Sequence, residues 1–166
     1  MSVSKIAYKY IKNSNIQQGF SLTELLITVG IIGVLVSFGY PAYTSYMGSA
    51  ARAAAQSDLM ALAAGMEKHK AATYSYAGAA SGGGNTGSPG FYNNWSPSSE
   101  PVANKQYDLS ISAVSAGGTT YVLTAAPVKG KPSFGDGSLY YYSDGRKAWD
   151  KNNDNSISSN EYCWVC

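Results

Sequence analysis

The sequence predicts an α+β protein in which one long N-terminal helix lies on a four-stranded antiparallel sheet. Three observations indicate this fold class. No charged side chain occurs from Leu25 to Ala51, apolar residues then recur every three or four positions, and alternating polar and apolar residues appear beyond residue 106. The second pattern is typical of a helix packed by one face, and the third is typical of strands.

The charge-free run is long enough to cross a membrane. Leu25 to Thr44 is twenty residues, about 30 Å as a helix. Lys5, Lys9 and Lys12 precede the run, and Arg52 is the first basic residue after it. The positive-inside bias therefore predicts a cytoplasmic N-terminus. A secretory signal peptide would need a short apolar region and a small-residue cleavage site, whereas this run continues into a helical pattern.

An acidic residue stands at the start of the apolar run, where a plain signal anchor would not need one. The segment reads Gly19-Phe20-Ser21-Leu22-Thr23-Glu24, and a carboxylate at the edge of a membrane helix is costly and usually functional. This segment closely resembles the class III signal of type IV prepilins and pseudopilins. The resemblance extends through Val29–Leu35 to Pro41, where that family has its helix-loosening proline.

The resemblance implies a role for each of these residues. Gly19 ends a leader of residues 1–19, and a prepilin peptidase would cut the Gly19–Phe20 bond and methylate the new amine of Phe20. Glu24 would neutralise that amine on a neighbouring subunit, because pairing relieves the desolvation penalty of both charges. Pro41, which lacks an amide proton, would let the assembly helix of residues 20–51 extend in a fibre.

The helix is expected to continue past the membrane into a globular head of residues 52–166. We expect it to run from Phe20 to about Tyr76, with its second half lying on the sheet. The apolar residues spaced three or four apart in this half form the face toward the sheet; they are Ala55, Leu59, Leu62 and Met66.

A Gly/Ser-rich loop of residues 78–90 follows the helix and cannot hold regular structure cheaply. It lies where pilins carry a variable loop between helix and sheet. Phe91, Tyr92 and Trp95 come next. Two interpretations remain open for these aromatic residues, a place in the core or an exposed adhesive patch, and the core is favoured.

Four segments predict strands. They are Tyr107–Ser112, Thr120–Ala125, Leu139–Tyr142 and Lys147–Trp149, and Ser143-Asp144-Gly145 is a hairpin turn signal between the last two. A long helix on four antiparallel strands is the pilin head, and the order of these strand motifs also resembles Gram-negative pilins.

The C-terminal loop, residues 150–166, contains a candidate calcium site. Residues 150–161 match the spacing of an EF-hand loop at positions 1, 3, 5, 9 and 12. Position 6 is Asn155 in place of Gly, although Asn tolerates the left-handed conformation. A polar surface turn is the alternative. The candidate ligands are Asp150, Asn152, Asp154, the Ser156 carbonyl, Ser158 through a water, and Glu161.

Cys163 and Cys166 are the two cysteines. A redox-active CxxC would open a helix in a thioredoxin-like unit, so a structural disulfide formed in the periplasm is predicted instead. Pilins usually pair more distant cysteines around the C-terminal loop. Since the upstream partner is missing here, the calcium loop would replace that staple.

Charge and composition argue against some classes of function. The leader carries +3, while the remainder carries nine basic against ten acidic residues, a net charge of −1. No basic stripe is present, so nucleic acid is not indicated by charge. The chain has one histidine and no Ser/His/Asp set or phosphate loop, which argues against an enzyme.

The expected function is a structural subunit of a type IV pilus, serving adhesion, twitching motility or DNA uptake. The precursor would be a single-pass inner-membrane protein and the mature subunit part of an extracellular filament. Its partners would be further copies of itself, other pilins, the prepilin peptidase and the assembly machinery. Two alternatives are a type II secretion pseudopilin and an adhesin or DNA-uptake minor pilin at the filament tip. Major and minor pilin are not separated by the sequence.

Overall fold

The structure is a computed structural model that describes residues 19–165. The predicted leader up to Gln18, and Cys166, therefore lie outside the described residues. The chain divides into two compact units, one ending at Gly39 and the other running from Tyr40 onward.

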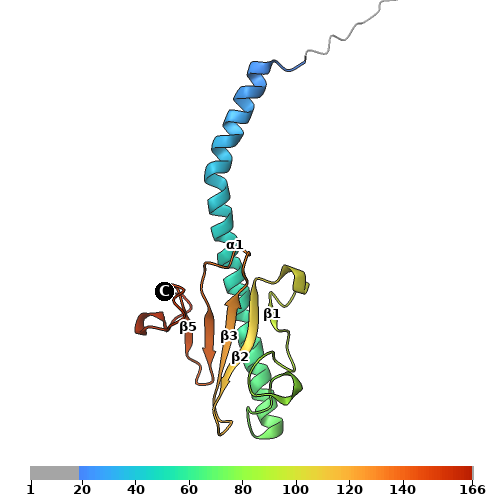
Figure 1. Cartoon of the computed structure of the whole chain (residues 1–166), viewed down its shortest axis with the longest axis vertical. Coiled ribbons are helices and arrows are strands. Elements are labelled where there is room, and N and C mark those ends of the chain that lie inside the picture. Colours follow the sequence, from blue (N-terminus) through green and yellow to red (C-terminus); the bar gives the residue numbers. More distant parts are fainter. Residues whose placement is uncertain (1–18, 166) are drawn as a thin grey trace, which may run out of the picture. The chain divides into compact units, whose positions relative to one another are not determined.

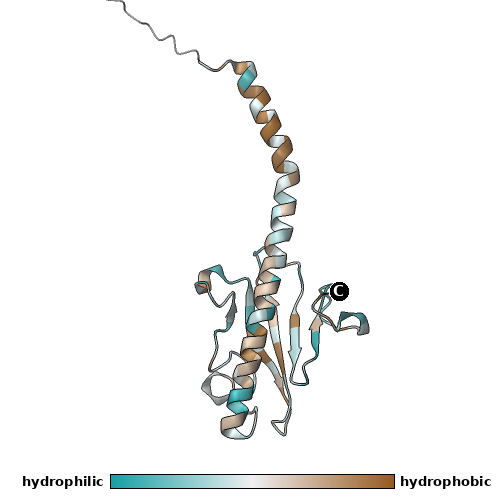
Figure 2. Ribbon diagram, turned by 180° about the vertical axis from the view of Figure 1, so that it is seen from behind, coloured by the Kyte–Doolittle hydropathy of each residue, from teal (hydrophilic) through white to brown (hydrophobic). Residues whose placement is uncertain are grey.

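A single helix, α1, runs from Leu22 to Thr73, which confirms the predicted helix to within a few residues. It begins where the Ser21 hydroxyl accepts the backbone N–H of Glu24 at 3.2 Å, an N-cap that satisfies one free donor of the first turn. Pro41 lies inside the helix without ending it. The part of α1 before Gly39 is strongly apolar (Figure 2) and includes a window suited to crossing a membrane.

The second unit contains an antiparallel sheet in the order β1-β2-β3-β4-β5 (Figure 1). The sheet has one strand more than the sequence predicts, because β1 is only two residues long and such a segment shows no alternation. The strands are β1 (Trp95–Ser96), β2 (Tyr107–Val114), β3 (Tyr121–Pro127), β4 (Leu139–Tyr142) and β5 (Lys147–Trp149).

The core of this unit lies between α1 and one face of the sheet. All four residues of the predicted helix stripe are completely buried, which confirms the period of the helix face. Alternate residues of β2 and β3 meet them from the sheet, because side chains of a strand point to opposite faces in turn. These sheet residues are Tyr107, Leu109, Ile111, Tyr121, Leu123 and Ala125.

The connections contain three short 3₁₀ turns, Ser81–Gly83, Val102–Asn104 and Ser159–Glu161. The first lies inside the predicted Gly/Ser-rich loop. That loop is tied down at Gly87, whose N–H and carbonyl each bond to Ile111 of β2 at 2.9 Å. The loop is therefore irregular, as expected, but is attached to the sheet.

The β3–β4 connection approaches the start of the C-terminal loop closely. Gly137 has a φ of +80°, and a Cβ placed on it would lie 1.7 Å from the carbonyl oxygen of Asp150. The Asp150 N–H also donates to the Ser138 carbonyl at 3.0 Å. Glycine is required at this position for two independent reasons, its conformation and the lack of space.

Candidate functional site

The processing and assembly residues stand at the first turn of α1. Gly19 and Phe20 precede the helix and are exposed, and Glu24 occupies the first turn. Among residues 19–165 no side chain pairs with the Glu24 carboxylate. Its position agrees with a helix N-terminus, where a negative charge is favourable. It also leaves the carboxylate available to another molecule.

The aromatic segment after the Gly/Ser-rich loop is divided between core and surface. Tyr92 packs against the core, whereas the Phe91 side chain is 41% exposed. Trp95 is partly buried and donates its indole N–H to the Glu100 carbonyl at 3.0 Å. The favoured placement in the core therefore holds for Tyr92 and does not hold for Phe91.

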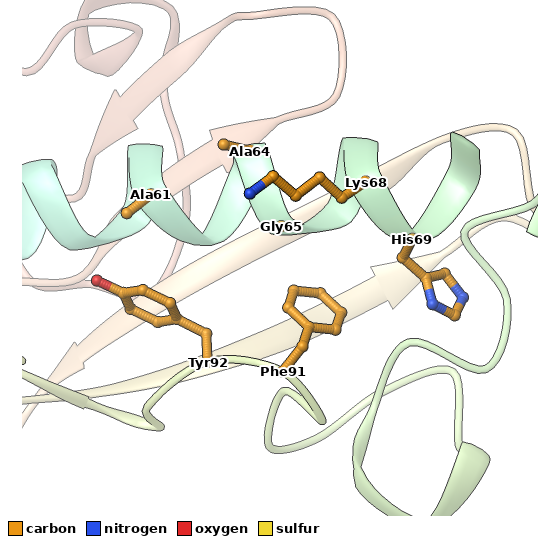
Figure 3. A pocket seen from close by; sticks show the side chains of 7 residues that line it. All are labelled: Ala61, Ala64, Gly65, Lys68, His69, Phe91 and Tyr92. Carbon is orange, nitrogen blue, oxygen red and sulfur yellow. The ribbon is translucent and has the colours of Figure 1, made fainter. Parts of the chain in front are cut away.

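Phe91 and Tyr92 form one wall of an open cavity of about 450 Å³ against α1 (Figure 3). Gly65 makes the approach of this wall possible, because a Cβ there would lie 2.4 Å from the Phe91 ring. His69 stacks beside Phe91 with ring centroids 6.1 Å apart. The cavity is lined by Ala61, Ala64, Gly65, Lys68, His69, Phe91 and Tyr92.

A buried carboxylate, Asp58, holds this aromatic segment onto α1. Its oxygens accept hydrogen bonds from the Tyr92 hydroxyl at 2.9 Å, the Ser96 hydroxyl at 2.5 Å, and both the hydroxyl and the N–H of Ser98 at 2.6 and 3.0 Å. Sequence reasoning missed this residue. Its helical spacing could have indicated burial, because Asp58 lies between Ala55 and Leu62 on the face of α1 that packs against the sheet.

The candidate calcium ligands form two groups along the chain, and the Glu161 carboxylate connects them by accepting backbone hydrogen bonds from Lys151 and Asn152. Asp150, Asn152 and Asp154 share one turn, in which the buried Asp150 carboxylate accepts the N–H groups of Asp154 at 3.0 Å and Asn155 at 2.9 Å. The Asp154 carboxylate in turn accepts the Ser156 N–H at 2.8 Å. Asn155 has a φ of +62°, so it takes the left-handed conformation that the sequence required of position 6.

Glu161 and Ser158 form the second group. The Glu161 carboxylate accepts the N–H of Ser158 at 2.9 Å and its hydroxyl at 2.7 Å, and these bonds hold the pKa of Glu161 below its usual value. No three His, Cys, Asp or Glu side chains are grouped to hold a metal ion anywhere in residues 19–165. Calcium binding stays a prediction, and the carboxylates already have partners within the protein.

Cys163 lies after this loop, with its sulfur 3.7 Å from the Asn160 carbonyl oxygen. Cys166 is outside the described residues, so the pairing of the two cysteines stays a prediction. The segment between them is anchored by Trp164, which is buried and directs its indole N–H at the carbonyls of Tyr140 and Ala148, both at 3.2 Å.

The basic side chains of the second unit differ in how far they are neutralised. Arg52 pairs with Asp136 at 2.5 Å, Lys105 with Asp108 at 2.7 Å and Arg146 with Asp144 at 2.7 Å. Within the described part of the chain, five lysines have no acidic partner: Lys68, Lys70, Lys129, Lys131 and Lys147. The positive charge without an acidic partner is thus divided among the end of α1, the β3–β4 connection and β5.

An apolar N-terminal helix, with Glu24 in its first turn and its second half on an antiparallel sheet, defines the class of pilin-like proteins. The family model described as "Type IV minor pilin ComP, DNA uptake sequence receptor" matches residues 41–136, more than half of the chain, and the "Prokaryotic N-terminal methylation motif" matches residues 14–40. The chain belongs to this family of type IV minor pilins.

Curated relatives agree with this assignment at the N-terminus. Several proteins named type IV major fimbrial protein FimA, and others named fimbrial protein, all from Dichelobacter nodosus, are 52% identical over 33 residues. That match covers 20% of this chain and 21% of each relative, so the chain spans about a fifth of the length of these relatives. No solved structure matches the chain. The methylation motif and the apolar helix indicate an inner-membrane prepilin that later joins an extracellular pilus.

Proposed function

We propose that this protein is a minor subunit of a type IV pilus that binds DNA during uptake. The match of residues 41–136 to a family described as a DNA uptake sequence receptor carries this proposal. That match favours the pilus over the secretion pseudopilus and favours DNA uptake over adhesion. The methylation motif supports cleavage after Gly19 and methylation of Phe20.

Assembly would use the Glu24 carboxylate as the partner of the N-terminal amine of a neighbouring subunit. The carboxylate lies exposed in the first turn of α1 and has no partner among the described residues. In the apolar interior of a filament an unpaired ammonium and an unpaired carboxylate would each be costly, so pairing them favours one register between subunits.

Glu24→Leu and Ser21→Ala separate this role from simple helix capping. Ser21→Ala removes the N-cap hydrogen bond but keeps the charge, so we expect it to enter filaments. Glu24→Leu should insert into the membrane yet be absent from sheared fibres, as measured by mass spectrometry of the intact mature chain. Equal incorporation of both variants would contradict the pairing of Glu24 with an amine.

DNA binding would rely little on long-range electrostatics, because residues 20–166 carry nine basic against ten acidic residues. Three of the basic side chains, Arg52, Lys105 and Arg146, are moreover paired with acidic ones. Binding affinity should therefore fall only moderately with salt, as expected when few phosphates are contacted. Fluorescence anisotropy with the full-length protein in detergent and labelled oligonucleotides tests this. A protein that binds no oligonucleotide at low salt, and whose deletion leaves DNA uptake unchanged, would refute the proposed function.

A further inference from the structure

The end of α1 has an unusual residue at the position that closes the helix. Tyr74 follows the last helical residue, Thr73, with a φ of +63°. Its N–H donates to the Lys70 carbonyl at 2.7 Å, the single bond of a left-handed helix cap. Gly or Asn usually occupies this position, because a larger side chain in the left-handed conformation crowds its own carbonyl oxygen. A tyrosine here lowers stability relative to either.

The Tyr74 side chain makes no contact within the described residues that offsets this cost. The Tyr74 side chain is 92% exposed, and within residues 19–165 its ring and hydroxyl make no hydrogen bond or ring contact. The turn is held by another residue, since the Thr73 hydroxyl lies 2.8 Å from both the His69 and the Ser75 carbonyl oxygens. A strained and exposed aromatic residue without a structural role is a candidate for contact with a ligand.

The surroundings of Tyr74 favour an anionic ligand. No acidic residue occurs from Lys68 to Gly90. The β2–β3 turn, which also has no acidic residue, adjoins this segment through a 2.9 Å bond from the Tyr76 N–H to the Gly118 carbonyl. The nearby Glu67 carboxylate already accepts hydrogen bonds from the Tyr76 and Tyr121 hydroxyls, at 2.8 and 3.3 Å.

We propose that Tyr74 stacks on a nucleobase of bound DNA, with the unpaired Lys68 ammonium near the adjoining phosphates. Lys68 precedes Tyr74 by six residues, so the ring would contact a base and the ammonium a phosphate elsewhere on the same strand. Proteins that bind single strands combine stacking and phosphate contacts in this way. This inference rests on the proposed function and names a contact of the DNA-binding surface. The base would come from a single strand or from a base step opened in a duplex.

The test uses the full-length protein in detergent with Tyr74→Asn and Tyr74→Phe. Asn keeps the left-handed cap without a ring, and Phe keeps the ring. Anisotropy with a labelled single strand and the matching duplex should show binding about tenfold weaker for Tyr74→Asn, within the range of about 5- to 150-fold for loss of one stacked base. Tyr74→Phe should bind within about twofold of the unchanged protein.

Thermal unfolding of the same samples separates contact from structure. Relief of strain should leave Tyr74→Asn with a melting temperature equal to or above that of the unchanged protein, while its DNA binding falls. A lower melting temperature accompanying the weaker binding would assign Tyr74 a structural role and overturn the inference. The probe whose binding falls, single strand or duplex, identifies the source of the base.

Two lysines provide a matched test of the charge. Lys68→Gln should weaken binding and reduce the salt slope by about one, whereas Lys129→Gln, which removes another exposed and unpaired lysine, should not. If the unchanged protein binds DNA and Tyr74→Asn binds equally well, the inference fails and the proposed function stands. If the unchanged protein binds neither probe, both fail.

Discussion

Two glycines of the β3–β4 connection allow a steric contact to be measured separately from a backbone conformation. Gly130 and Gly137 both have a φ of +80°. A Cβ on Gly130 would meet nothing within 4 Å, whereas one on Gly137 would lie 1.7 Å from the Asp150 carbonyl oxygen. Alanine at either position bears the left-handed penalty, about 1–2 kcal/mol, and only Gly137→Ala adds the overlap.

No side-chain rotation can relieve the overlap, because the position of the new Cβ is fixed by the backbone of residue 137 and the Asp150 oxygen is itself a backbone atom. The Asp150 segment must shift, and the 3.0 Å bond from its N–H to the Ser138 carbonyl is then lost. We therefore expect Gly137→Ala to cost about 4 kcal/mol or more of unfolding free energy and Gly130→Ala about 1 kcal/mol.

Urea unfolding of a soluble fragment beginning at Tyr40, followed by tryptophan fluorescence, measures both values. Trp149, which precedes Asp150, is buried and reports directly on this part of the sheet. If the two variants differ by less than about 1 kcal/mol, the contact between Gly137 and Asp150 does not exist as described.

Three further predictions concern stability. Asp58→Ala leaves the buried Ser96 hydroxyl and the Ser98 N–H without their acceptor and should lower the free energy of unfolding by about 3 kcal/mol in the same urea titration. The control Asp144→Ala breaks only an exposed ion pair and should lower it by less than about 0.5 kcal/mol. Burial, together with Glu67, raises the pKa of Tyr76 to about 12. The pKa of this tyrosine is about 10 in the unfolded chain, so its contribution to folding stability is present below pH 10 and is lost as the pH rises toward 12. Between pH 9 and 12 the melting temperature should therefore fall less steeply with pH for Tyr76→Phe than for the wild-type protein. An equal pH dependence of the two melting temperatures would contradict this. Millimolar calcium should raise the melting temperature, because binding at a hundredfold excess over Kd adds about 2.7 kcal/mol to the free energy of unfolding. Asp154→Asn should reduce this shift. If calcium does not shift the melting temperature of the wild-type protein, residues 150–161 form a polar turn and not a calcium site.

Features that depend on local pattern were predictable from the sequence. The bounds of α1, its buried stripe and four of the five strands follow from periodicity, because the period of apolar residues directly reflects which side chains share a face. The first-turn position of Glu24 likewise follows from its place at the start of the apolar run. The left-handed conformation of Asn155 was anticipated from the residue type that position 6 requires.

Features that depend on contacts between distant segments were decided by the tertiary structure. Asp58 holds residues 92–98 through hydrogen bonds that join positions 34 to 40 residues apart, and no local pattern encodes such pairing. The approach of Phe91 to α1 depends on Gly65, and the need for glycine at 137 depends on Asp150. In each case the second residue lies on another element. The sequence by itself determined the class of protein and its elements through local periodicity, whereas packing between elements decided which polar and aromatic side chains are buried and which face solvent.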